Sequence, residues 1–333
     1  MNPIPLVRVS AFVPFLRVLG DIGTPIERRL DESHIPSGLL DNPENLLPLA
    51  HLLSFLSRIA RAEGIEDLGM RAAAQSHVAG LGLFGRILTQ SASLNIALEK
   101  ASRLIPLYNS GQRIQVDRWQ GRARISHRLP KLAGEGRRYA NQFTMLMLID
   151  LMRQAAGATW RPSEIHLERG VDDPAIYEGL AVPLRESDTA AVICDPMLLG
   201  YPLQSGTALP ANGNDVQLLA STAPPGDFID SIRQVILTYM RNDTIGIETI
   251  SSVIGLSSRG LQRRLRERGL DYSEIVAATR LALARRLLED RGIAVTDIAQ
   301  ELGYSDAANF TRAFRKWTGL APSVYRAGLF GES

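Results

Sequence analysis

Apolar residues recur at helical spacing in three stretches of the N-terminal part. Leucines follow one another every three or four residues over Glu44–Arg61, and Ser93 stands before a second such run that continues to Leu107. Tyr139–Ala155 repeats the pattern a third time. We therefore predict helices at these three positions.

Between and after these helices the apolar residues alternate with polar ones. Arg113–Trp119 and Arg122–Leu129 alternate on either side of Gln120-Gly121, which predicts a β-hairpin. Two further short segments, Glu164–Glu168 and Ala190–Cys194, are also predicted to be strands. The fold class expected for this part of the chain is a helix-rich α+β domain.

Residues that break regular structure gather between Tyr201 and Asp227, where prolines, glycines and asparagines are dense. Such a composition suits a linker. The chain has 333 residues, which is more than one typical core needs. We therefore expect a first domain over residues 1–205, a linker over 206–227 and a second domain over 228–330.

Downstream of the linker the pattern is helical throughout and contains an internal repeat. Ile250–Ser257 matches Ile298–Ser305 in character: a short helix, a glycine at a turn and a serine that can cap the next helix. Each next helix carries an apolar pair four residues apart. These pairs are Leu261 with Leu265, and Phe310 with Phe314. The repeat predicts an all-α domain with two helix-turn-helix units, at about 247–268 and 295–318, joined by one long helix over Ser273–Glu289.

With each apolar pair buried, a helical wheel places polar side chains on the opposite face. In the major groove of DNA, arginine donates two hydrogen bonds to guanine, and glutamine can bind adenine by donating one hydrogen bond and accepting another. The side chains expected to contact DNA are Arg259, Gln262, Arg263 and Arg266 in the first unit, and Ala308, Asn309, Arg312, Arg315 and Lys316 in the second. The second face holds fewer base-reading side chains, so we expect it to contribute more phosphate contacts.

The joining helix has a suitable length for a bipartite DNA site. Its residues at about 1.5 Å each give roughly 26 Å. Successive turns of the major groove on one face of DNA lie roughly 34 Å apart. The two recognition helices could therefore enter neighbouring turns of the groove.

The charge of the whole chain is only +2, which by itself does not indicate a nucleic-acid binder. Its distribution is more informative, because Ser258–Arg268 holds five arginines against the single acid Glu267. A charge run alone is usually a solvated helix face. It gains meaning here because it coincides with a predicted recognition helix.

Composition and motifs exclude several classes of protein. No signal pattern opens the chain, and no apolar run approaches the roughly 20 residues that span a bilayer, so we expect a cytoplasmic protein without a membrane partner. Cys194 is the only cysteine, which rules out an internal disulfide and a multi-cysteine zinc site. The five histidines are scattered rather than paired at helical spacing, so we predict no metal and no cofactor.

The C-terminal motifs resemble the AraC/XylS family of bacterial transcription regulators over Phe228–Arg326. The residues that carry the resemblance are the run Arg280–Leu288, Ile298-Ala299, Gly303-Tyr304, Phe310, Arg312–Lys316, Gly319, Pro322 and Tyr325-Arg326. The resemblance implies sequence-specific binding of promoter DNA and, as is usual in the family, activation of transcription through RNA polymerase.

The N-terminal half differs from the histidine-bearing β-barrel sugar sensor of the family's founding member. Its Leu40–Pro43 segment, the leucine-rich helix that follows and the hairpin near Gly121 are similar to a helix-rich sensor domain in another branch. Because residues 1–205 have their own apolar helices and are followed by a linker, we expect them to sense a small-molecule effector or to form a homodimer. The resemblance is to a branch whose ligands are diverse. It identifies no effector.

Three features allow a functional and a structural interpretation. Gly80–Gly85 spells G-x-G-x-x-G, but the segment before it reads as helix rather than the strand that a dinucleotide site requires, so close packing or a turn is favoured. Cys194 has no neighbouring histidine that would form a thiolate, which favours a core cysteine over a DNA-repair alkyl acceptor. Met145, Met147 and Met152 are interpreted as core rather than as a ligand cage.

Arg122, Arg124 and Arg128 lie on one side of the second strand of the predicted hairpin. They are candidate effector-binding residues, because guanidinium groups suit phosphate and carboxylate. A solvated sheet face is the commoner arrangement for such residues. The alternative to a regulator is an enzyme or a DNA-repair protein with an appended helix-turn-helix unit.

Overall fold

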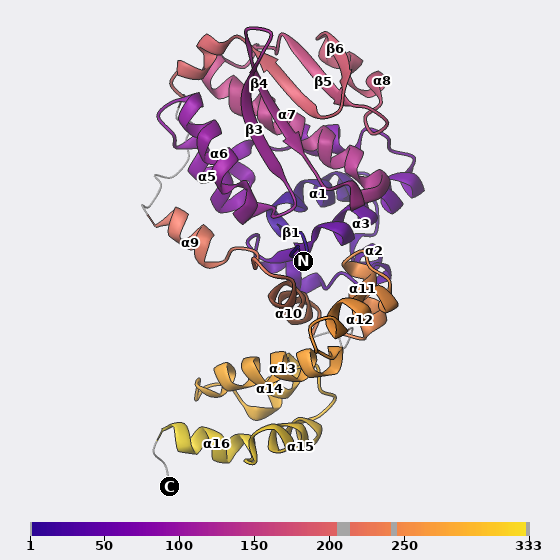
Figure 1. Ribbon diagram of the computed structural model, residues 1–333, viewed down its shortest axis with the longest axis vertical. Coiled ribbons are helices and arrows are strands. Elements are labelled where there is room, and N and C mark those ends of the chain that lie inside the picture. The colour runs from indigo at the N-terminus through magenta and orange to yellow at the C-terminus, as the bar shows by residue number, and fades with distance from the viewer. Residues whose placement is uncertain (1, 205–213, 241–244, 331–333) are drawn as a thin grey trace. The chain divides into compact units, whose positions relative to one another are not determined.

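The computed structural model describes residues 2–204, 214–240 and 245–330. These residues divide into two compact units. One holds Ile4–Ser33 and Ser37–Pro225, and the other holds the rest of the chain, chiefly from Gly226 onward. The first, N-terminal unit is a mixed α/β structure, and the second, C-terminal unit is helical, as the sequence predicts (Figure 1).

The N-terminal unit is built around a five-stranded sheet of order β3-β4-β7-β5-β6. Its strands are β3 Arg113–Trp119, β4 Arg122–Arg128, β5 Glu164–Glu168, β6 Leu184–Ser187 and β7 Ala190–Cys194. All neighbours pair antiparallel except β5 and β6. The predicted hairpin is confirmed, and Gln120 and Gly121 turn it with φ of 50° and 79°. Both residues take the positive φ that a two-residue hairpin turn requires.

The other main elements of the N-terminal unit are helices. They are α1 Val13–Asp21, α2 Ile26–Glu32, α3 Leu49–Glu63, α4 Leu68–Ala74, α5 Gly82–Thr89, α6 Leu94–Tyr108, α7 Arg137–Ala156, α8 Pro174–Tyr177 and α9 Asp215–Ser221. Helix α6 packs against β3, and α7 packs against β7 and α4 (Figure 1). Two predicted helices are confirmed as α6, whose first turn Ser93 caps, and α7.

The helix predicted over Glu44–Arg61 begins later than expected. Leu46–Pro48 forms the short strand β2, which pairs antiparallel with β1 Leu6–Arg8, and the helix starts at Leu49. Pro48 explains the difference, because a proline disfavours the helical conformation of the residue before it. The leucine spacing alone does not reveal this boundary.

The G-x-G-x-x-G segment forms a turn and a close contact between segments, as the sequence predicts. It follows the helix α4 rather than a strand, and Gly82 has φ of 62° at the start of α5. A side chain at Gly85 would collide with the carbonyl oxygen of Val78. The glycines therefore allow a turn and a close approach between neighbouring segments.

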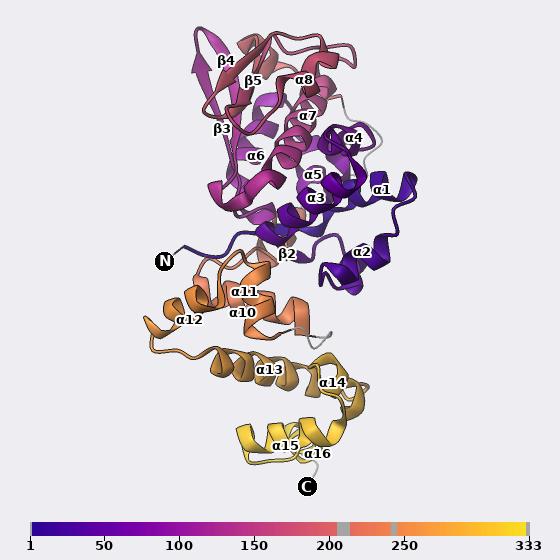
Figure 2. The same cartoon turned by 90° about the vertical axis from the view of Figure 1, so that its right-hand side faces the viewer.

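The C-terminal unit contains seven described helices. They are α10 Phe228–Tyr239, α11 Ile247–Val253, α12 Ser258–Arg266, α13 Tyr272–Leu288, α14 Val295–Glu301, α15 Ala307–Thr318 and α16 Pro322–Leu329. The long helix α13 runs between the group α10–α12 and the group α14–α16 (Figure 2). It has 17 residues and agrees with the predicted joining helix to within one residue at each end.

Helix α9 lies within the segment that the sequence predicts as a linker. Its Leu219 is fully buried in the N-terminal unit, and the side chain of Arg8 donates hydrogen bonds to the carbonyl oxygens of Leu219 and Thr222, at 2.9 and 3.1 Å. Arg8 is itself completely buried and is paired with Glu44 at 2.8 Å. The last turn of α9 is thus fixed to the strand β1.

Candidate nucleic-acid interface and ligand cavity

The first helix-turn-helix unit consists of α11 and α12 with a sharp turn between them. Gly255 has φ of 73° at this turn, a conformation that costs other residues energy. The hydroxyl of Ser257 accepts a hydrogen bond from the backbone N–H of Gly260 and so caps α12. Leu261 and Leu265 are 0% and 1% exposed, which confirms the predicted buried pair.

The second unit, α14 and α15, repeats this construction with one change. Gly303 takes φ of 71°, and a side chain there would collide with the carbonyl oxygen of Met240, which directly follows α10. The cap of α15 is Asp306 rather than the predicted Ser305, and it accepts from the N–H of Asn309 at 2.7 Å. A carboxylate caps as well as a hydroxyl and also suits the positive end of the helix dipole.

The side chains predicted to contact DNA lie mostly on exposed faces. Arg259, Arg263, Arg266, Ala308, Arg312, Arg315 and Lys316 are exposed, and Gln262 and Asn309 are half-buried. The buried pairs Leu261 with Leu265 and Phe310 with Phe314 lie on the opposite side of their helices. The structure thus brings the predicted residues together as one polar face on each recognition helix.

Two of these residues are already engaged within α15. The side-chain amide of Asn309 donates to Ser305 and Asp306, at 3.0 and 2.6 Å, and its carbonyl accepts from Arg312. These bonds fix Asn309 beside the helix N-terminus. A base contact in which the amide of Asn309 donates a hydrogen bond would require one of its two bonds to Ser305 and Asp306 to break.

Arg264 of α12 and Arg268, which lies just after this helix, do not belong to the set predicted to contact DNA. Arg264 and Arg268 lie over the ring of Phe228, with the guanidinium carbon 5.8 and 5.9 Å from the ring centre. Such stacking of a cation on an aromatic ring is favourable. These two side chains therefore cover the body of the C-terminal unit.

Helix α13 holds both helix-turn-helix units. The hydroxyl of Tyr272, in its first turn, donates to the carbonyl of Ile245 just before α11 at 2.6 Å. Arg280, midway along α13, donates to the carbonyl of Leu302 after α14 at 3.1 Å and lies 4.7 Å from the ring centre of Tyr304. The orientation of each unit is thus tied to one rigid helix.

The arginines of strand β4 are paired with acids or exposed to solvent. Arg124 donates two hydrogen bonds to Asp117, both of 2.8 Å, which raises the pKa of Arg124 above its usual value. Arg122 lies 3.6 Å from Glu164 and Arg128 is exposed. Their role in effector binding stays a prediction.

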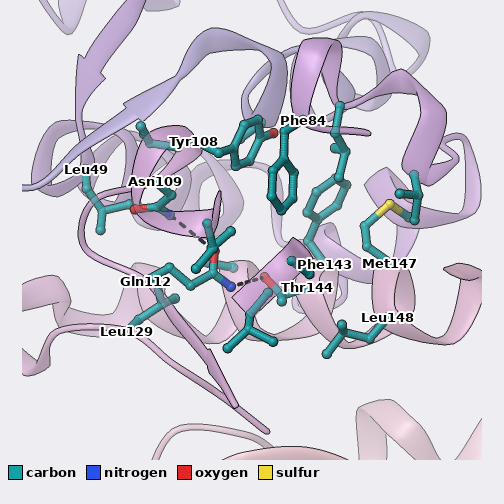
Figure 3. Close-up of a pocket in the computed structure, with 18 of the residues that line it drawn as sticks. Leu49, Phe84, Tyr108, Asn109, Gln112, Leu129, Phe143, Thr144, Met147 and Leu148 are labelled. Carbon is teal, nitrogen blue, oxygen red and sulfur yellow. Dashed lines mark hydrogen bonds between the residues drawn. The ribbon is translucent and has the colours of Figure 1, made fainter. Parts of the chain in front are cut away.

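A cavity of about 80 Å³ lies elsewhere in the N-terminal unit. Its walls come from β1, the start of β3, and helices α1, α3, α5, α6 and α7. Four of its lining residues are polar: Tyr108, Asn109, Gln112 and Thr144. Figure 3 shows Asn109, Gln112 and Thr144 together at one end, whereas Phe84, Phe143 and Met147 lie toward the other.

Sequence reasoning missed this cavity. Met145 and Met152 are fully buried in the core, as predicted, but Met147 and Leu148 on the same helix line the cavity wall. Leucine, phenylalanine and methionine at helical spacing give the same pattern whether they pack against a neighbour or face a void. No signal in the sequence separates the two cases.

The remaining candidate features have structural roles. Cys194 is buried in β7, and burial raises its pKa to about 11, so it is a protonated core thiol at neutral pH. Within the described ranges, no three metal-ligating side chains come together. Of the helices that the structure describes, none is both long and apolar enough to cross a membrane.

Comparison with known proteins agrees with this architecture. Residues 23–203 match the family described as the N-terminal arabinose-binding domain of AraC transcription regulators, and residues 250–328 match a helix-turn-helix domain family. The HTH-type transcriptional regulator VirS of Mycobacterium tuberculosis is 27% identical over 95% of this chain and 94% of its own. The ornithine utilization regulator of Pseudomonas aeruginosa is 23% identical over 96% of each chain.

Among solved structures, the transcriptional regulator CdpR of Pseudomonas aeruginosa is 21% identical, with 91% of this chain and 96% of that chain covered and a TM-score of 0.38. The family matches confirm the resemblance seen in the C-terminal motifs and the assignment of the N-terminal half to a sensor-type domain. The chain therefore belongs to the AraC family of DNA-binding transcription regulators, which are not enzymes.

Proposed function

We propose that this protein is a sequence-specific activator of transcription that responds to a small effector. The observation that carries the proposal is the pair of recognition helices, α12 and α15, each with an exposed polar face opposite a buried apolar pair. In this proposal residues 228–330 bind promoter DNA, and residues 1–205 sense the effector or form a homodimer. Residues 206–227 link these two parts of the chain.

The two faces differ in what they contribute to binding. Arg259, Arg263 and Arg266 are exposed on α12 beside Gln262, so this face supplies the hydrogen-bond donors that read guanine and adenine. On α15, Arg312, Arg315 and Lys316 supply positive charge for the DNA backbone. Ala308 and Asn309, at the start of α15, lie where the N-terminus of a recognition helix meets base edges.

Regulation requires that the effector bind two states of the protein with different affinity. A coupling free energy of about 1 to 3 kcal/mol changes DNA affinity by about five- to 150-fold. A change in the geometry of a homodimer is the simplest route, because it decides whether two DNA-binding units reach neighbouring half-sites together. Contact with RNA polymerase then converts DNA binding into activation.

The first test is genomic DNA capture by the purified full-length protein, followed by titration of a captured promoter fragment at several salt concentrations. The logarithm of affinity should fall by about 0.9 per phosphate contact with the logarithm of salt concentration. Replacement of Arg312, Arg315 and Lys316 with alanine should flatten the slope. The control is Arg28→Ala, at an exposed side chain in α2 of the N-terminal unit, which should leave the slope unchanged. A flat salt response of the unaltered protein would contradict DNA binding by these faces.

The second test removes residues 1–225. The remaining fragment should still bind the promoter, because the C-terminal unit has its own buried core, but more weakly and without regulation. Transcription in vitro with RNA polymerase should rise with the full chain. Repression by the full chain would refute the activator role, and full activity of the fragment under every condition would refute the sensor role.

A further inference from the structure

The cavity of the N-terminal unit has a chemistry that restricts what can fill it. Of the 24 residues that line it, 20 are apolar, and none of these described residues carries a charge. Charged ligands would lose their hydration here without gaining a counter-ion, and a sugar would bury hydroxyl groups on every carbon against apolar walls. Both classes are disfavoured by the walls as they stand.

One end of the cavity can hold a single polar group. Gln112 and Asn109 are 5% and 6% exposed, and they are joined to each other and to Thr144 by two hydrogen bonds of 3.4 Å (Figure 3). These bonds are longer than the usual 2.7 to 3.2 Å and are correspondingly weak. A primary amide has two donors and one acceptor with two lone pairs, so this cluster can still donate to and accept from a ligand.

The other end suits an apolar body. Phe15 and Phe143 lie with ring centres 5.2 Å apart, Phe84 stacks on Tyr108 at 4.8 Å, and Met147 completes the wall. Empty apolar space of this kind weakens a core, because the lining atoms lose dispersion contacts. Water is a poor occupant of this end, since it needs two to four polar partners.

We infer that this cavity binds a small uncharged molecule with one hydrogen-bonding head, such as an alcohol or a primary amide, and a short unbranched apolar body. The head lies against Gln112 and Thr144, and the body extends toward Phe143 and Met147. The inference deepens the proposed function and rests on it, since the bound molecule is then the effector of a ligand-responsive regulator.

The volume limits the size of this ligand. A cavity of about 80 Å³ is roughly half as large as an engineered cavity that takes benzene. Met147 has three rotatable side-chain bonds and can yield space that a leucine would not. An apolar body of about three or four carbon atoms therefore fits the unliganded cavity, and a longer body requires Met147 and its neighbours to move.

To test the inference, the full-length protein is titrated with primary amides and alcohols from propyl to octyl, and ligand-observed NMR measures their binding. Affinity should rise about fourfold with each added methylene group until the cavity is filled and should then fall. Arabinose, ornithine and hexanoate serve as the sugar, amino-acid and anionic probes. None of these three should compete with the best amide.

Two pairs of matched variants locate the binding. Met147→Trp fills the cavity and should abolish binding of the amides, whereas Met197→Trp, at a side chain 75% exposed elsewhere in the same unit, should leave it unchanged. Gln112→Leu should weaken the amide about fivefold through loss of one hydrogen bond, and the exposed Gln115→Leu should not. Thr144→Val removes the hydroxyl at the polar end and should weaken the amide, so the proposal can still be tested if Met147→Trp does not fold.

The possible results are unambiguous. Three results would overturn the inference. The first is that no neutral probe binds, and the second is that Met147→Trp and Thr144→Val both leave binding intact. The third is competition by arabinose, ornithine or hexanoate. Promoter binding is measured on the same preparations without ligand. A protein that binds promoter DNA but no neutral probe refutes only the ligand class, whereas a protein that binds no promoter refutes the proposed function.

Discussion

Replacing Arg8 with methionine tests how strongly helix α9 is held to the N-terminal unit. The guanidinium group has five N–H donors. In the structure it makes five hydrogen bonds: to the carbonyls of Leu107, Glu44, Leu219 and Thr222 and to the carboxylate of Glu44, at 2.8 to 3.1 Å. Methionine keeps much of the apolar volume but leaves all five acceptors without this donor.

The expected loss of stability follows from burial. Burial lowers the pKa of Arg8 while Glu44 raises it, and an arginine stays charged under such opposing effects. Removal of one partner from a buried ion pair typically costs about 3 to 5 kcal/mol, because the other charge is left uncompensated. The side chain of Glu44 is 17% exposed and also accepts from the N–H of Leu83, so we expect the lower end, about 3 kcal/mol.

Urea unfolding and hydrogen exchange together measure this effect. Arg8→Met should lower the free energy of unfolding of the N-terminal unit and increase exchange at Leu219 and the other amides of α9. A second change, Glu44→Gln, should recover part of the loss by removing the unpaired charge. Arg28→Met, which removes an exposed ion pair with Glu32, is the control and should have no measurable effect. Unchanged stability, or unchanged exchange in α9, would refute the role assigned to Arg8.

Three further predictions concern single side chains. Arg263→Ala should cost about 1 to 3 kcal/mol on the captured promoter and much less on random DNA, whereas Arg268→Ala, which removes a side chain stacked on Phe228, should not change the preference between the two DNAs; fluorescence anisotropy with both DNAs decides this. Arg280→Met removes the side chain that holds the second helix-turn-helix unit to α13, so affinity for a full bipartite site should fall while affinity for a site containing only the first half stays constant. His127 is buried without a hydrogen-bond partner in the described structure, and burial lowers its pKa from 6.5 to about 4. As the pH falls, His127 therefore takes up a proton in the unfolded protein before it does so in the folded protein. The free energy of unfolding should fall by about 2 kcal/mol between pH 7 and pH 5. Thermal unfolding should show this drop to be smaller in His127→Phe, and an equal drop in both proteins would contradict it.

The helix-turn-helix units were predictable because their signals are local. An apolar pair four residues apart, a glycine with positive φ and a capping side chain all fall within about 20 residues. The exception is the cap of α15, where Ser305 and Asp306 are adjacent and both can cap. Sequence spacing does not choose between two such neighbours, but the backbone conformation of Asp306 does.

The short strands of the N-terminal unit were less predictable. β1, β2 and β6 contain three or four residues each, too few to show alternation. Their pairing depends on partners distant in sequence, as when Leu6 pairs with Pro48. The ligand cavity is the extreme case, since it is defined by what seven elements leave unfilled between them.

Strand β1 connects the cavity to helix α9 within the N-terminal unit. Val7 lines the cavity and forms a β-bridge with Asn109, while the next residue, Arg8, holds the last turn of α9. Successive side chains of a strand point to opposite faces, so one strand serves both sites. A ligand head bound beside Asn109 would therefore act on the strand that fixes α9, which directly precedes the C-terminal unit in sequence. If the ligand regulates DNA binding by this route, its contacts at β1 must differ between two states of the protein by about 1 to 3 kcal/mol, the usual size of such a coupling.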